Sequence, residues 1–180
     1  MTRVVLVPGV LALLPEYAGI EDPVAELRAA CLEAVGWLGV DVRVIADEQG
    51  ERVAAYLLGN RSNSAIAPDG QGGGAEDRSN SAIAPDGRSV LVVGNGSAKR
   101  TEKAPGHLDE RARAFDDALG AALRAGDLSD VDLSPAAELW ASVGAIADLR
   151  DLLHGETATV DYDDDPFGVQ YWVMRWECAS

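Results

Sequence analysis

The chain has 180 residues, 47% of them hydrophobic and 25% charged, which is typical of one water-exposed folded domain and excludes a disordered or membrane-embedded protein. Thirty acidic and fifteen basic residues give a net charge of −15, which repels nucleic acid and anionic membranes and excludes both as partners. The two cysteines, Cys31 and Cys178, are too few for a disulfide framework or a metal knuckle, so we expect a cytoplasmic protein without a metal or other cofactor.

The first sixty residues alternate between strand and helix patterns. Residues 3–7 form a short β-branched run that Pro8 and Gly9 stop, which predicts a first buried strand. Asp22 and Pro23 predict a helix start, with Asp22 as the N-cap and Pro23 at the first helical position. The apolar stripe of that helix comprises Val24, Leu27, Cys31, Val35 and Leu38, and a second strand and a short second helix follow at residues 40–46 and 51–58.

A tandem duplication follows the second helix. Residues 61–70 read RSNSAIAPDG, and residues 78–87 repeat the same ten letters after a glycine-rich linker. One short repeat rich in Ser, Asn, Gly and Pro cannot bury a core of its own, so a solenoid is excluded. We therefore predict a single domain over residues 1–180 that carries a flexible surface loop at residues 59–88.

The stretch SVLVVGNGSAKRTEKAPG, residues 89–106, is the centre of the pattern. Its apolar run ends abruptly at Gly94, and a polar, basic connection follows it. In α/β proteins a buried strand commonly delivers a functional loop at its carboxyl end. We therefore predict that any ligand pocket lies at the carboxyl ends of the strands.

The second half of the chain adds helices and a final pair of strands. Residues 108–125 show helical spacing in front of Gly126, Ser134 begins another predicted helix that contains Leu139 and Trp140, and residues 145–153 predict a further one. Strands are predicted at residues 157–162 and 169–176, separated by an Asp-, Pro- and Gly-rich turn. The whole pattern predicts an α/β fold, a three-layer sandwich whose mostly parallel central sheet carries an antiparallel C-terminal strand pair.

Three segments carry a family resemblance. They are VPGVLALLPE at residues 7–16, GNGSAKRTEKAPGHLDERARAFDDAL at residues 94–119, and YDDDPFGVQYWVMRW at residues 162–176. Together and in this order they resemble the class III extradiol ring-cleavage dioxygenase superfamily, in particular its small actinobacterial members of unassigned function. The resemblance implies the fold and the position of a pocket.

The resemblance does not extend to the residues of the family's chemistry. Catalytic relatives hold Fe(II) with two histidines and a carboxylate, and a further histidine acts as the catalytic base. Where a relative has its first histidine this chain has Gly9, no histidine precedes His107, and Ala98 stands at the position of the catalytic histidine. The resemblance therefore implies a pseudoenzyme that has lost the metal ligands.

The loop that begins at Gly94 supports several interpretations. Small residues followed by Lys99 and Arg100 could cradle an anion, although the spacing matches no phosphate-binding motif. A tight structural turn explains the same residues. A third interpretation is a hydrolytic site built from Ser97, His107 and an aspartate, but the chain lacks the usual nucleophile motif of such enzymes.

Two further groups could serve as metal ligands. His107 and His154 lie at predicted helix ends far apart in the sequence, where structural or solvated histidines are common. The acidic cluster at residues 161–165 offers oxygen ligands but lacks the spacing of a calcium loop. We therefore assign neither group to a metal site.

These observations favour a metal-free, non-catalytic relative of the dioxygenases that binds a small molecule or takes part in an assembly. The alternatives are an enzyme of another class that reuses the ancestral pocket and a residual iron-dependent ring-cleavage dioxygenase. The candidate partners are a small anionic or aromatic ligand and a second copy of the chain. The candidate ligand-binding residues are Gly9, Glu16, Asn95, Ser97, Lys99, Arg100 and His107.

Overall fold

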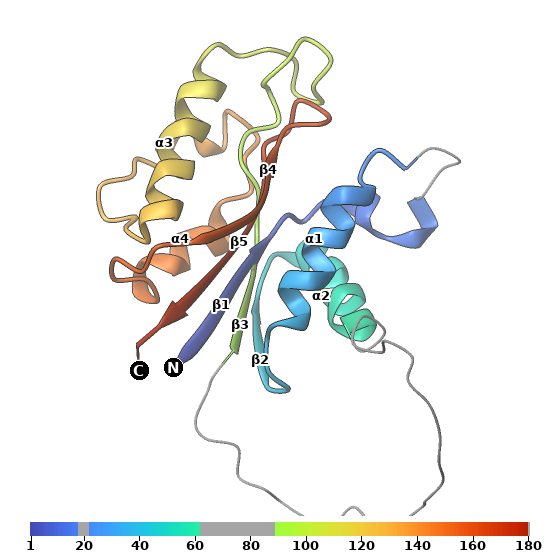
Figure 1. Cartoon of the computed structure of the whole chain (residues 1–180). Helices are drawn as coiled ribbons and strands as arrows, with labels where there is room; N and C mark the ends of the chain where they lie inside the picture. Colours follow the sequence, from blue (N-terminus) through green and yellow to red (C-terminus); the bar gives the residue numbers. More distant parts are fainter. Residues whose placement is uncertain (18–21, 62–88, 180) are drawn as a thin grey trace, which may run out of the picture.

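The computed structural model describes residues 1–17, 22–61 and 89–179, which form a mixed α/β fold around one five-stranded sheet (Figure 1). The strands lie in the order β2-β3-β1-β5-β4; β2, β3 and β1 run parallel, and β5 is antiparallel to both of its neighbours. The predicted α/β class, with a mostly parallel core and an antiparallel C-terminal pair, is confirmed. The strands are β1 (Thr2–Val7), β2 (Val42–Ile45), β3 (Ser89–Val93), β4 (Thr159–Asp164) and β5 (Tyr171–Cys178).

In the first half of the chain each helix begins a few residues from its predicted start. Helix α1 begins at Ala25 with Val24 as its N-cap, so the prediction of Asp22 as N-cap and Pro23 as the first helical residue is wrong. In α2 the start lies three residues before the predicted one because Asp47 caps the helix, its Oδ1 atom accepting a hydrogen bond of 2.7 Å from Gly50 N. The helix also includes Gly59, which we expected to end it, and residues 62–88 of the predicted loop lie outside the described residues. The helices are α1 (Ala25–Gly36), α2 (Glu48–Asn60), α3 (Arg111–Ala125), α4 (Gly144–Ala147) and the 3₁₀ turns η1 (Leu11–Leu13), η2 (Pro15–Tyr17), η4 (Ser134–Ala136) and η5 (Asp148–Asp151).

Hydrophobic clusters pack against both faces of the sheet. Along β1, Val4 and Leu6 point into the cluster that includes α3, α4 and η5, whereas Val5 and Val7 point into the cluster that includes α1 and α2. Figure 1 shows these two sets of helices on opposite sides of the strands. Because both faces are covered, β1, β3 and β5 have apolar side chains at most positions. The predicted α1 stripe is confirmed, since Val24, Leu27, Cys31, Val35 and Leu38 are all buried.

Three sequence predictions in the second half of the chain are wrong. The helix expected from Ser134 is the single turn η4, and Trp140, which we expected within that helix, is 57% exposed at a backbone φ of 56°. Helix α3 begins at Arg111, so Leu108 falls outside it and is 46% exposed. The helix expected at residues 145–153 is divided into α4 and η5.

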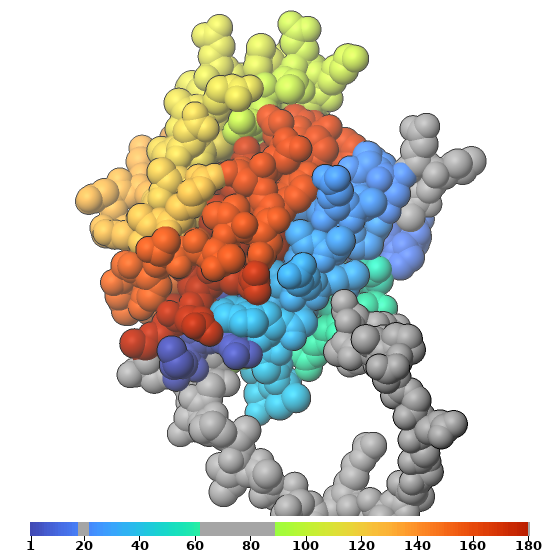
Figure 2. Space-filling view, in the orientation of Figure 1, coloured from blue at the N-terminus to red at the C-terminus, as the bar shows by residue number. Residues whose placement is uncertain are grey.

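Strand β4 forms an exposed edge of the sheet. Its segment faces the viewer in Figure 2, between the α3 side and the α1 side of the molecule. Asp161, Asp163 and Asp164 place three carboxylates on this edge, and such charges discourage pairing with another strand. Within residues 1–17, 22–61 and 89–179, no helix has the length and apolar character that a membrane span requires.

Candidate functional site

The three segments that carry the family resemblance meet at one edge of the sheet. Strands β1 and β3 end there as the paired residues Val7 and Val93, and β4 ends there at Asp164 because it runs antiparallel to β5, which itself opposes β1. This is the carboxyl edge of the parallel strands, where α/β proteins usually place their ligands. The candidate site is therefore the loop that follows β3, together with the turn between β4 and β5.

The loop after β3 crosses over the end of β1 and joins the residues that precede β5. Gly94 N donates a hydrogen bond of 2.9 Å to Val7 O, and Gly96 N then donates one of 2.9 Å to Gln170 O. Gln170 N returns a hydrogen bond of 3.0 Å to Ser97 O. Residues 94–97 therefore extend the sheet where the chain of β1 turns away at Pro8.

Close packing explains the two glycines of this loop. A Cβ atom on Gly96 would lie 2.6 Å from Asp116 Oδ1 and 2.8 Å from Gln170 Cβ, and one on Gly94 would lie 2.6 Å from Ser142 O. These distances are shorter than ordinary van der Waals contacts, so any larger residue would displace the loop. Glycine is needed at these two positions because neighbouring protein atoms lie close to the backbone.

The backbone N–H groups of residues 94–98 all donate to protein atoms. Besides Gly94 and Gly96, Asn95 N donates to Ser142 O at 3.0 Å, and Ala98 N donates to Leu139 O at 3.0 Å. Ser97 N donates to a carboxylate of α3 at 2.7 Å. An anion cradle needs amides that point at the ligand. The amides of residues 94–98 are committed to holding the loop on the sheet, which corrects the anion-cradle interpretation.

Asp116 on α3 is the buried carboxylate that receives the loop. Its Oδ1 accepts from Ser97 N, and its Oδ2 accepts from Ser97 Oγ at 2.6 Å and from Arg100 Nη1 at 3.1 Å. The side chain is fully buried, and burial raises the pKa of Asp116 above its ordinary value against the opposing effect of these hydrogen bonds. Ser97 is itself fully buried, so its hydroxyl has no access to a substrate.

Arg100 clamps the loop onto the turn between β4 and β5. Its guanidinium donates to Asp165 Oδ2 at 2.7 Å as well as to Asp116, and only 8% of its side chain is exposed. Arg100 N also donates to Gly168 O at 3.0 Å. Because the guanidinium pairs with two carboxylates, it holds the loop in place and does not point at an anionic ligand. This differs from the interpretation of Arg100 as part of an anion cradle.

The other predicted site residues do not converge on one point. Gly9 O accepts from Gln49 Nε2 at 2.5 Å, and Glu16 forms an exposed ion pair with Arg52 at 2.9 Å. The Lys99 ammonium lies 5.5 Å from the centre of the Trp140 ring, and His107 Nδ1 lies 2.9 Å from Glu102 O. In the part of the chain that the structure describes, no three His, Cys, Asp or Glu side chains come together as a metal site would require.

A hollow of about 830 Å³ lies beside the clamped loop, at the same edge of the sheet. The Arg100–Asp165 ion pair joins its two walls, which are the segment from Thr101 to Pro105 and the turn that contains Phe167. The sequence indicated the turn but gave no sign that it would form a hollow with the loop, because the two segments are more than fifty residues apart. The lining residues are Thr101, Glu102, Lys103, Pro105, Asp165, Pro166, Phe167 and Gly168.

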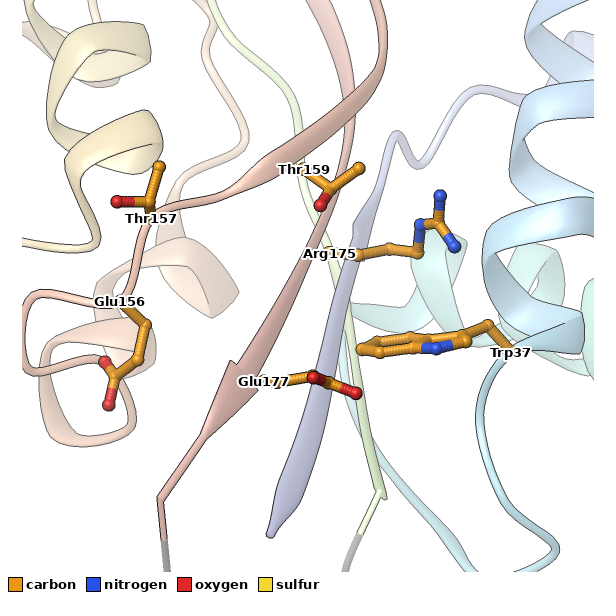
Figure 3. Close-up of a pocket in the computed structure, with 6 residues that line it drawn as sticks. All are labelled: Trp37, Glu156, Thr157, Thr159, Arg175 and Glu177. Atoms are coloured by element: carbon orange, nitrogen blue, oxygen red, sulfur yellow. The ribbon is translucent and has the colours of Figure 1, made fainter.

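A second hollow, of about 450 Å³, lies at the opposite edge of the sheet. Figure 3 shows Arg175 and Glu177 of β5 extending towards the Trp37 ring. The Arg175 guanidinium lies 5.5 Å from the centre of that ring and donates two hydrogen bonds to Asp161, at 2.6 and 2.7 Å. The one cation of this lining, Arg175, is already paired with Asp161, and the lining adds the carboxylates of Glu156 and Glu177, so this hollow is the weaker candidate.

No family model, curated protein or solved structure matches the chain in the three comparisons.

Proposed function

We propose that this chain is a metal-free binding protein for a small aromatic anion, built on a three-layer α/β fold related to the extradiol dioxygenases. One observation carries the proposal, namely the hollow of about 830 Å³ at the carboxyl edge of the sheet. Its volume falls in the range of small-molecule sites. Its walls belong to two of the three segments on which the family resemblance depends.

The lining of the hollow suits a flat apolar group with one negative charge. Phe167, which is 36% exposed, and the neighbouring Pro166 and Pro105 provide apolar surface. Lys103 provides the cation of the lining. Of the two carboxylates in the lining, Asp165 is paired with Arg100, and Glu102 is exposed to solvent. An aromatic ring can stack on the phenyl group while its carboxylate meets the ammonium group.

Iron chemistry does not fit the residues at this edge. A facial Fe(II) site takes imidazole and carboxylate donors, and neither Gly9 nor Ala98 has a side chain that can donate to a metal. A Cβ atom on Gly9 would also lie 3.2 Å from Val93 Cγ1, so the position is closely packed.

Ligand-observed NMR tests the proposal. Benzoate should show saturation transfer from the protein, whereas benzamide, which lacks the charge, should bind at least about tenfold more weakly. Lys103→Ala and Phe167→Ala should each abolish most of the signal. Lys99→Ala and Leu108→Ala are the matched controls, because these exposed or half-buried residues lie outside the lining of the hollow. Binding that survives both hollow variants would overturn the proposal.

A separate experiment tests the dioxygenase alternative. The protein is reconstituted anaerobically with Fe(II), desalted, analysed for iron, and assayed with protocatechuate and oxygen. We expect neither bound iron nor ring cleavage. Stoichiometric iron with oxygen-dependent cleavage would show that the family motifs are misaligned on this chain.

A further inference from the structure

An apolar groove of about 640 Å³ runs along the outer side of α3. The inner side of this helix packs against the sheet through Ala112, Leu119 and Leu123, which are fully buried. The outer side presents Ala114 and Ala118 to solvent. The groove therefore lies on a face of the helix that the described chain leaves uncovered.

The far wall of the groove is the segment after α3. Val131 and Pro135 are half-buried there, and Leu139 forms the fully buried floor together with Phe115 from the helix. Small alanine side chains on the near wall allow an incoming backbone to approach closely. Apolar anchors of a peptide commonly enter a groove of this form.

Three carboxylates follow the rim of the groove, those of Asp127, Asp130 and Asp132. Hydrogen bonds from Ser129 lower the pKa of Asp127, and hydrogen bonds from Ser134 lower that of Asp132, so both carboxylates keep their charge in mild acid. The rim is therefore negative under ordinary conditions.

The guanidinium that lines the groove, that of Arg111, does not offset this charge. Arg111 is balanced by two carboxylates, since it donates to Asp109 at 2.8 Å and to Glu138 at 2.8 Å. A second guanidinium, that of Arg150, donates to Leu128 O at 3.1 Å and to Val131 O at 2.7 Å behind the rim. One such cation offsets part of the charge of the three aspartates, and the rim keeps a net negative charge.

We propose that this groove binds a protein segment whose apolar side chains are flanked by Lys or Arg. The apolar floor accepts the hydrophobic anchors, and the three aspartates pair with the flanking cations. A second copy of the chain is a poor occupant, because each copy has a net charge of −15 and would bring further negative charge to the acidic rim. This inference is independent of the hollow at the carboxyl edge.

Selection from a random-peptide phage library tests the proposal. The full-length protein is the target, and Ala118→Trp, which fills the groove from an exposed helical position, is the counter-target. Enriched peptides should contain apolar residues with flanking Lys or Arg above their frequency in the library. Far-UV circular dichroism and urea unfolding establish that the variant is folded, and Ala114→Arg provides a second block if it is not.

Charge neutralisation gives the matched control. The triple variant Asp127→Asn, Asp130→Asn and Asp132→Asn keeps the acceptor oxygens and should weaken a selected peptide about tenfold. The control is the triple variant Asp41→Asn, Asp148→Asn and Asp151→Asn, which removes the same number of charges at exposed positions outside the groove. It should leave the affinity for the peptide nearly unchanged.

Three results would overturn the proposal. One is a set of peptides without excess basic residues, or no enrichment at all. Another is binding that Ala118→Trp and Ala114→Arg do not affect while both variants are folded. The last is a dimer of the wild-type protein that Ala118→Trp dissociates, because the groove would then be an interface between two copies.

Discussion

The buried carboxylate of Asp116 should be worth several kcal/mol to the folded state, and its neighbour on α3 should be worth almost nothing. The perturbation is Asp116→Ala, and the matched control is Asp117→Ala, which removes the same group one residue along the same helix. Asp116 is 1% exposed, whereas Asp117 faces solvent. The two variants therefore differ in what the carboxylate contacts and not in helix propensity.

The magnitude follows from the three hydrogen bonds of Asp116. Its loss leaves the N–H and the O–H of Ser97 without acceptors in a fully buried position, at about 1–3 kcal/mol for each unsatisfied group. Arg100 loses one of two carboxylates but keeps Asp165. We expect Asp116→Ala to lower the free energy of unfolding by about 3–5 kcal/mol, and Asp117→Ala to change it by about 0.5 kcal/mol or less.

Urea unfolding followed by far-UV circular dichroism measures both values. A double-mutant cycle with Ser97→Ala should give a coupling energy of about 1–2 kcal/mol, because each single variant breaks the same pair. A loss below about 1 kcal/mol for Asp116→Ala, or one equal to that of Asp117→Ala, would refute the reasoning. It would mean that the loop after β3 does not depend on this carboxylate for its position.

Gly96→Ala should cost about 1–3 kcal/mol of unfolding free energy in urea, because its Cβ would lie 2.9 Å or less from three neighbouring atoms. Gly59→Ala, which has open space on α2, should instead add about 0.5–1 kcal/mol, and the same sign for both would contradict the packing argument. Burial raises the pKa of Cys178 to about 11, so neither cysteine should react with N-ethylmaleimide before guanidinium chloride unfolds the chain; labelling of the folded protein, detected by mass spectrometry, would contradict this expectation. Hydrogen bonds from Arg111 lower the pKa of Asp109 to about 2, so its contribution to stability is present above pH 3.8 and is lost as the pH falls towards 2. The urea midpoint of Asp109→Asn should therefore fall less steeply with acid than that of the wild type, and equal slopes would count against the ion pair.

The spacing of apolar residues predicted the parts of the fold in which one helix face or one strand packs directly against the core. The stripe of α1 and the apolar runs of β1 and β3 could be recognised because one helix face or one strand sits against a continuous core. The N-cap of α2, Asp47, was missed although Asp is a preferred residue at that position. The predicted start of the helix, at residue 51, lies three residues after its observed start at Glu48.

The candidate site could be predicted in position but not in detail. The sequence indicated the loop after the central strand, and the structure places that loop at the carboxyl edge of the sheet. The role of Asp116 was missed, although its position four residues after Ala112 and three before Leu119 lies on the buried stripe of α3. The spacing shows that the carboxylate is buried but not which groups it binds. Its burial depends on Ser97 and Arg100, which only the tertiary fold brings to it. Trp140 illustrates the same limit, since its exposure follows from a left-handed backbone that local spacing does not reveal.

The position of β1 between β3 and β5 has a consequence for folding during synthesis. Thr2 pairs with Cys178, and Leu6 pairs with Met174, so one side of this strand finds its partner only after nearly all of the described chain has been made. Until then one edge of β1 is unpaired, and Val4 and Val5, which are fully buried in the folded protein, are exposed. Contacts of such large sequence separation form slowly. The acidic character of the chain then has a second use, because mutual repulsion between nascent copies keeps their open edges apart.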